Sequence, residues 1–253
     1  MRSIIVIGTD TGVGKTTVAA ALARSIRYMG VNVGVIKPFA ASEKRYSNKY
    51  RSEDAAILAK AAGVDDEDNE INPFFYRMPT SPYLAACIAR ETAIAIPKAL
   101  SSIQKVAAKH ELLIIEGIGG LMVPLTENET FADLAKAVGA PIILVARCKA
   151  GVLNHILLTL HVSRSHGLRI AGVVLNLFPP RPNIIDKELI NVVKKLTGAE
   201  VLCVIPRLRG GSELQLELKE EITHNILGKL DPCLDVPKSH ISPSHNTNKK
   251  TRN

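Results

Sequence analysis

The chain has 253 residues, and this length is enough for one large domain with a well-buried core. Only 4% of its residues are aromatic and 46% are hydrophobic, so helices packed on a parallel sheet are favoured over a β-sandwich. The net charge is +8, but the segment after Pro237 is basic and contains no acid, so a solvated tail explains the excess better than a nucleic-acid surface.

Apolar runs alternate with helical patterns along most of the chain. The runs predict strands at Ile4–Ile7, Val33–Ile36, Leu112–Ile115, Pro141–Ala146, Ile170–Leu175 and Val201–Ile205. The stretches between and after them predict helices at Lys15–Tyr28, Asp54–Ala62, Ser81–Arg90, Pro97–Lys109, Thr130–Val138, Val152–His166, Ile184–Leu196 and Ser212–Leu230. This order implies a single-domain α/β fold over residues 1–230, in which a mostly parallel sheet carries helices on both faces. Residues 231–253 form the predicted basic, disordered tail.

Punctuation, apolar length and cysteine spacing refine this organisation. Ser81 followed by Pro82 and the Thr130–Asp133 segment are helix-start signals, and Gly139 is a helix stop. No apolar run approaches the length of a membrane span, and the first residues are typical of a strand rather than a signal peptide. The four cysteines are scattered without metal-like spacing. We therefore expect a cytoplasmic protein with reduced thiols and no membrane contact.

The segment "GTDTGVGKTT" begins at Gly8, directly after the first predicted strand. Gly8 and Gly14 are separated by five residues, whereas the strict phosphate-loop pattern has four. Gly12 and Gly14 nevertheless let backbone N–H groups approach phosphate oxygens, and the following helix offers its positive end. Lys15 is suited to neutralising phosphate oxygens and Thr16 to placing its hydroxyl on Mg²⁺. The context of strand, glycine loop and helix therefore predicts a nucleotide site of the P-loop NTPase kind.

Acidic and basic residues follow other predicted strands. Glu116 ends a buried strand, where ligands of open α/β sheets bind, and a carboxylate there needs water or a cation. Asp54 begins a helix and is equally explained as a metal ligand or as a partner of the helix dipole. Hard oxygen ligands beside nucleotide phosphates favour Mg²⁺. Lys37 could stabilise a transferring phosphoryl group, but its position alone favours an ordinary surface lysine.

Taken together, these segments resemble dethiobiotin synthetases from Gly8 to about Leu208. The matching pieces, in order, are "GTDTGVGKT", "VIKP", the helix of Asp54, "PTSPYLAA", "EGIGG", "TFADLAKAVGAPIILVA", "AGVLNH", "GLRIAGVVLN" and "IPRL". The family also has the wider glycine spacing of this loop. The resemblance implies ATP- and Mg²⁺-dependent closure of a ureido ring in biotin biosynthesis. In that reaction CO₂ adds to 7,8-diaminononanoate as a carbamate, ATP phosphorylates the carbamate, and the second amine displaces phosphate.

The resemblance also implies roles for individual residues. It makes Lys37 and Lys15 catalytic, and it gives the metal to Thr16, Asp54 and Glu116. The substrate contacts would come from Thr11, Lys37, Ser42, Gly151, Val152, Leu153 and Asn154. The ATP contacts would come from Gly12, Val13, Gly14, Lys15, Thr16, Thr17, Asp54, Glu116, Gly117, Ile118, Gly119, Asn176, Leu177, Pro206, Arg207 and Leu208. The family is a homodimer, and residues 151–154 of one subunit would bind the substrate carboxylate in the site of the other.

One position departs from the family pattern. The family usually has Ser or Thr four residues after the catalytic lysine, and this chain has Ala41 there, followed by Ser42. Either Ser42 takes over the substrate contact through a shifted loop, or the contact is absent. The basic stretch 42–52 that follows is favoured as a solvated surface loop over a segment with a role in gating.

Two other functions stay open at the level of sequence. An amide synthetase of the cobyrinic-acid type would share the fold, but such proteins usually carry a glutaminase domain with a nucleophilic cysteine, which these cysteines do not match. A MinD/ParA-like switch ATPase would carry a second lysine near the start of the loop. The residues before Gly14 are Thr, Asp, Thr, Gly and Val, and none of them is lysine.

Overall fold

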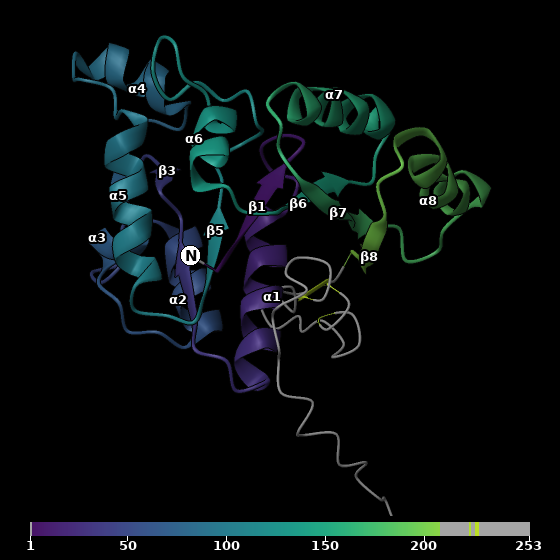
Figure 1. The fold of residues 1–253 in the computed structure, drawn as a ribbon, viewed down its shortest axis with the longest axis horizontal. Helices are drawn as coiled ribbons and strands as arrows, with labels where there is room; N and C mark the ends of the chain where they lie inside the picture. The colour runs from purple at the N-terminus through teal and green to yellow at the C-terminus, as the bar shows by residue number, and fades with distance from the viewer. Residues whose placement is uncertain (1, 208–222, 224–225, 228–253) are drawn as a thin grey trace, which may run out of the picture.

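A computed structural model describes residues 2–207, 223, 226 and 227 of the chain. Six strands form one parallel sheet in the order β2-β5-β1-β6-β7-β8 (Figure 1). The strands are β1 Ser3–Gly8, β2 Val33–Ile36, β3 Phe39–Ala41, β4 Phe74–Tyr76, β5 Leu112–Glu116, β6 Ile142–Arg147, β7 Ile170–Phe178 and β8 Val201–Pro206. The helices are α1 Lys15–Tyr28, α2 Glu53–Ala62, α3 Asp68–Ile71, α4 Pro82–Ala89, α5 Ile96–Ala107, α6 Phe131–Val138, α7 Val152–Ser165 and α8 Ile184–Thr197.

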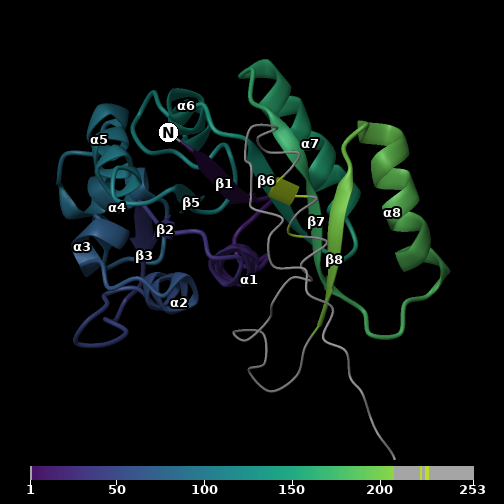
Figure 2. The ribbon, with the colours of Figure 1, turned by 60° about the horizontal axis from the view of Figure 1, so that its bottom comes forward.

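The sheet is buried on both faces, which is why its strands are apolar without interruption. Alternate residues of β1 enter two separate cores, with Ile4 and Val6 in one and Ile5 and Ile7 in the other. The first core is closed by α1 and α2, and the second by α5, α6, α7 and α8. Figure 2 shows α1 and α2 on one side of the sheet and α6 and α7 on the other. The predicted α/β architecture is therefore confirmed.

The local start and stop signals behave as predicted. The Ser81 hydroxyl accepts a hydrogen bond from Leu84 N–H at 3.4 Å, and Asp133 closes a capping box with Thr130. Gly139 ends α6 with a left-handed backbone, φ 71°. In the part of the chain that the structure describes, no helix combines the length and apolarity needed to cross a membrane.

A second, two-stranded sheet was not predicted. β3 and β4 pair in parallel beside the end of β2, and the one-turn helix α3 precedes β4. Strands of three residues are too short to show an alternating pattern, so the sequence gives no periodic signal for them. The last predicted helix, Ser212–Leu230, and the 231–253 tail lie outside the described residues, except for helical positions 223, 226 and 227. The side chains of Ile226 and Leu227 are buried in the first core.

Strand order brings the predicted functional segments together. β1 lies between β5 and β6, and β2 lies on the other side of β5. Because these strands are parallel, the carboxyl ends of β1, β5 and β2 lie side by side at one edge of the sheet. The glycine loop, Glu116 and Lys37 therefore meet there.

Candidate active site

The glycine loop forms a cradle between β1 and α1. Gly12 and Gly14 have φ values of 71° and 90°, in the left-handed region that other residues rarely adopt. Gly14 is also the N-cap of α1 and makes no side-chain cap, so the first N–H groups of the helix remain open for an anion. A Cβ on Gly14 would lie 1.9 Å from the Asn176 amide nitrogen, which donates to the Val13 carbonyl at 2.9 Å. Both backbone geometry and close packing therefore require glycine here.

Three segments of the chain place charged groups beside this cradle. The Lys37 ammonium lies 2.6 Å from Glu116 Oε1 and also contacts the Asp54 carboxylate. The Thr16 hydroxyl lies 2.8 Å from the same Glu116 oxygen and 3.0 Å from Asp54 Oδ1. The cluster thus joins the first turn of α1 to the ends of β2 and β5 and to the start of α2.

Burial and pairing set the charges of these groups. Burial lowers the pKa of the Lys37 ammonium, but Glu116 and Asp54 outweigh it and raise that pKa above its ordinary value. Burial raises the pKa of Glu116, and Lys37 opposes that rise. Burial also works against ionisation of Asp54, yet Lys37 and Thr16 bring its pKa below the usual value. Burial, followed by repulsion from Lys37, lowers the pKa of Lys15 to about 8. The site therefore holds two lysines whose pKa values are shifted in opposite directions.

The interpretation of Lys37 as an ordinary surface lysine is wrong. Only 5% of Lys37 is exposed, and the ammonium pairs with two carboxylates that lie 17 and 79 residues away in the sequence. Glu116 is completely buried and faces that ammonium. The ammonium is therefore the cation that the sequence predicted as one possible partner of this carboxylate. The carboxylate of Asp54 turns toward Thr16 and Lys37, so it does more than complement the dipole of α2.

The donor set fits a magnesium ion that is shared with a nucleotide. The second oxygen of Glu116, Oε2, is buried and has no hydrogen-bond partner among the described residues. The Thr16 hydroxyl and the Asp54 carboxylate add two further hard oxygens. The described part of the chain contains no cluster of three or more His, Cys, Asp or Glu side chains that could hold a metal alone. A cation here would therefore need phosphate oxygens and water to complete its coordination, as Mg²⁺ commonly does.

A cleft of about 630 Å³ opens beside the cluster. It is lined by Thr11, Lys15, Thr16 and Thr17 of the glycine loop and first turn of α1, by Lys37, Asp54 and Glu116, and by Ala41, Thr80 and Ser81. Ser42 does not line the cleft, and its hydroxyl donates to the Lys44 carbonyl at 3.0 Å. Thr80 and Ser81 were not predicted as site residues, although "PTSP" is the stretch that supplies them. They are hydroxyl-bearing residues in the lining of the same cleft as Ala41, which has no hydroxyl.

The remaining predicted residues fall into three groups. Ile118 and Gly119 line the cleft directly after Glu116, while a side chain on Gly117 would collide with Ile7 at 2.3 Å. Asn176 and Leu177 lie in β7 next to Pro206 in β8, and Arg207 N–H donates to the Phe178 carbonyl at 2.9 Å. Leu208 lies outside the described residues.

The third group is the start of α7. Gly151 caps this helix with φ 84°, and Val152, Leu153 and Asn154 form its first turn. None of these four residues lines the cleft beside the phosphate loop of the same chain.

Known proteins share this fold. A family model described as an AAA domain matches residues 2–213. The structure is similar to a ParA family ATPase from Chlorobium tepidum TLS, with a TM-score of 0.52 and 14% identity over 91% of this chain and 98% of that one. It is also similar to the MinC:MinD cell division protein complex of Aquifex aeolicus, with a TM-score of 0.54 and 14% identity over 91% and 94% of the chains. Fold and phosphate loop together define a P-loop NTPase-like protein.

Sequence relatives narrow this class. The chain is 40% identical over 216 residues to the ATP-dependent dethiobiotin synthetase BioD of Nitrosopumilus maritimus, which covers 85% of this chain and 93% of the relative. It is 35% identical to the enzyme of the same name from Bacillus licheniformis, over 85% of this chain and 90% of the relative. The chain belongs to the dethiobiotin synthetase family. The similarity to ParA and MinD proteins shows the shared fold alone.

Proposed function

We propose that this chain closes the ureido ring of dethiobiotin from 7,8-diaminononanoate, CO₂ and ATP, with release of ADP and phosphate. One observation carries the proposal beyond family membership. The buried Lys37 ammonium, the Thr16 hydroxyl and the Glu116 and Asp54 carboxylates meet beside a glycine loop, and all four residues line one cleft. This is the arrangement that transfer of a phosphoryl group to an anionic acceptor needs.

The reaction balances in three steps. One amine adds to CO₂ and loses a proton, giving a carbamate. A carbamate oxygen then attacks the γ-phosphorus of ATP, the bond to the bridging oxygen breaks, and ADP leaves. The second amine attacks the carbonyl carbon of the mixed anhydride and loses a proton, phosphate leaves with the bonding electrons, and the cyclic urea forms. No step requires a side-chain nucleophile, so catalysis rests on positioning and on charge stabilisation.

The residues of the chain supply that stabilisation. Lys15, at the first turn of α1, would neutralise oxygens of the β- and γ-phosphates, and Lys37 would offset charge where carbamate and γ-phosphate approach each other. Thr16, Asp54 and Glu116 would hold Mg²⁺. When bound, that ion would supply positive charge to the phosphate oxygens during transfer. Because Lys37 now holds both carboxylates, its ammonium must turn toward the substrate for this role.

Nucleotide and carboxylate contacts complete the proposal. The Asn176 amide lies against the phosphate loop, and its Oδ1 has no partner among the described residues, which supports an adenine contact at the end of β7. The start of α7, which does not line the cleft of its own chain, would bind the substrate carboxylate in the site of a second subunit of a homodimer. An enzyme that acts on such small substrates also agrees with the cytoplasmic location expected from the sequence.

Purified protein should release phosphate and form dethiobiotin only when ATP, Mg²⁺, bicarbonate and 7,8-diaminononanoate are all present. Omission of each component in turn is the control, and mass spectrometry identifies the product. Absence of turnover that depends on the diamine would reject the proposal. ATP hydrolysis stimulated by ammonia and a carboxylate would favour an amide synthetase, and hydrolysis stimulated by a partner protein would favour a switch ATPase.

A further inference from the structure

The backbone of Lys37 lies just beyond the main sheet. The ladder between β2 and β5 ends with Ile36 paired to Ile115, so Lys37 receives no support from β5. The next residue is Pro38, which has no N–H to donate. Lys37 N–H instead donates to the Ile71 carbonyl at 2.7 Å, at the end of α3. The end of α3 therefore replaces the sheet as the support for the Lys37 N–H.

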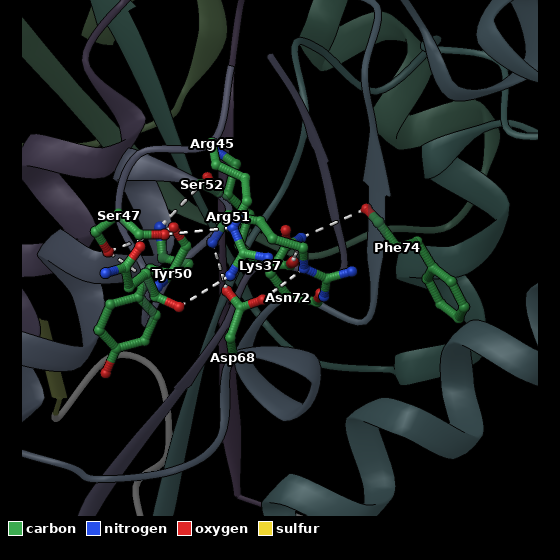
Figure 3. Close-up of polar contacts among 11 residues, drawn as sticks. Lys37, Arg45, Ser47, Tyr50, Arg51, Ser52, Asp68, Asn72 and Phe74 are labelled. Atoms are coloured by element: carbon green, nitrogen blue, oxygen red, sulfur yellow. Dashed lines mark hydrogen bonds and ion pairs between the residues drawn. The ribbon is translucent and has the colours of Figure 1, made fainter. Parts of the chain in front are cut away.

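Asn72 completes this support from a fully buried position. Its amide nitrogen donates to the Lys37 carbonyl at 2.8 Å and approaches the Phe74 carbonyl at 3.4 Å (Figure 3). A reversed amide would place its oxygen against both carbonyls, so the two contacts fix its orientation. Oδ1 has no partner among the described residues, which is costly for a buried amide. The Asn72 side chain therefore accepts this cost while it donates to the carbonyls of Lys37 and Phe74.

A salt bridge ties the basic loop to the same support. The Arg51 side chain donates to the Asn72 carbonyl and to Asp68 Oδ2, each at 2.5 Å, and Arg51 N–H donates to Asp68 Oδ1 at 3.0 Å (Figure 3). The 42–52 loop is mostly exposed, as a solvated connector would be, but its last residues are anchored. Arg51 therefore contacts the backbone of Asn72, the residue whose side chain donates to the Lys37 carbonyl.

We propose that Asn72 is a positioning residue for Lys37 in ring closure, and that Arg51 braces it; this inference rests on the proposed function. Asn72 holds the backbone from which the Lys37 ammonium reaches the carboxylates and the cleft. A displacement of about 1 Å in such a group can reduce a rate by roughly 100-fold. The phosphate loop lies between β1 and α1. Among the described residues, no hydrogen bond joins this loop to Asn72.

Asn72→Ala tests this inference. We expect kcat to fall by about 10- to 100-fold, while the Kd for Mg-ATP stays within about threefold of the wild-type value. A readout without turnover is the rate at which acetic anhydride modifies Lys37, followed by peptide mass spectrometry. This rate should rise in the variant, while that of Lys15, which α1 holds, should not. Asn32→Ala is the control, because the side-chain amide of the exposed Asn32 donates a hydrogen bond to the Lys109 carbonyl at 3.2 Å, before the opposite end of β2.

Each other outcome decides against a specific claim. A wild-type protein without turnover rejects the proposed function, and Lys37 labelling then still tests the hold of Asn72. Turnover and labelling like those of Asn32→Ala overturn the inference. A fall of kcat, ATP affinity and Tm in proportion assigns Asn72 a merely structural role. If Asn72→Ala does not fold, Arg51→Ala on the loop decides: we expect kcat to fall by about 3- to 10-fold at constant ATP affinity, and unchanged kcat and labelling overturn the inference.

Discussion

At the scale of single residues, one ammonium balances two carboxylates that share one task in the proposed reaction, which is to hold the metal ion. Lys37 lies within hydrogen-bond distance of both Glu116 and Asp54. A carboxylate as buried as Glu116 would strongly disfavour ionisation without that partner. The free protein therefore already holds, as ion pairs among Lys37, Glu116 and Asp54, the charged groups that a bound metal ion and phosphate would contact.

Removing the Lys37 ammonium should separate binding from chemistry. We predict that Lys37→Ala lowers kcat by roughly 100- to 1,000-fold and keeps ATP binding, because the phosphate loop is intact. Without metal, the variant should lose about 3–5 kcal/mol of stability, since Glu116 remains buried beside Asp54 without its hydrogen-bonded cation. Phosphate-release kinetics and urea unfolding with and without Mg²⁺ measure both effects. Unchanged turnover would remove Lys37 from the mechanism.

The other lysine should make nucleotide binding depend on pH. The pKa of Lys15 is about 8 in the free protein, and bound phosphates should raise it because they favour the ammonium form. The affinity for ATP should therefore be constant below about pH 8 and fall as the pH rises, by roughly tenfold per unit. Calorimetry near pH 8 in buffers of different ionisation enthalpy should detect uptake of about half a proton. Lys15→Met should abolish both effects, and a flat affinity up to pH 9 in the wild-type protein would contradict the assignment.

At the scale of elements, the phosphate loop is coupled to the end of a distant strand. The Asn176 amide, at the end of β7, fills the space beside Gly14 and holds the Val13 carbonyl. Gly12, by contrast, has open space where a Cβ would stand, although its φ is also positive. A substitution at Gly12 therefore introduces backbone strain alone, whereas a substitution at Gly14 introduces both backbone strain and a steric clash.

This difference predicts unequal losses of stability. Gly12→Ala should cost about 1–2 kcal/mol from backbone strain alone. Gly14→Ala should cost a further 1–3 kcal/mol, roughly, because its Cβ meets the Asn176 amide. Urea unfolding without nucleotide measures both. Asn176→Ala introduced into the Gly14→Ala variant should recover part of the loss, and equal losses for the two glycine variants would contradict the coupling.

Sequence patterns predicted the long elements well and the short ones not at all. Every strand of the main sheet was predicted because an apolar run is the direct consequence of burial on both faces. β3, β4 and α3 consist of three or four residues each, so no periodicity can develop in them. Ala41 lies in β3, Asn72 directly follows α3, and Thr80 follows β4, which explains why this part of the cleft and its support was the least predictable.

At the scale of the whole molecule, strand order assembles the site. Three neighbouring strands end at or shortly before Lys15, Lys37 and Glu116. Each of these residues could therefore be placed at one sheet edge from the sequence. The contact between Lys37 and the carboxylates could not, because it depends on how α2 and the α3 segment pack around the end of β2. The resemblance to a family supplied roles for these residues, and the structure supplies the partners that make the roles physically reasonable.

Two subunits should be needed for a complete substrate site. An apolar groove of about 310 Å³ runs between α7 and α8, lined by Leu153, Ile184, Ile185, Glu188, Leu189 and Val192. Ile184 and Ile185 are 70% and 75% exposed in the single chain, an exposure that a partner would relieve. Leu153 belongs both to this groove and to the helix start proposed to bind the substrate carboxylate of the other subunit.

We therefore predict that Ile185→Asp converts a homodimer into monomers, because a charge would enter an apolar interface. Light scattering after size-exclusion chromatography should show twice the chain mass for the wild-type protein and the chain mass for the variant. The KM for diaminononanoate should rise by at least about tenfold and the KM for ATP should change little, since the phosphate loop and its cleft belong to one chain. Leu196→Asp, on an exposed residue of α8 outside the groove, is the control and should remain dimeric. A wild-type monomer with full activity would show that one chain binds the substrate alone.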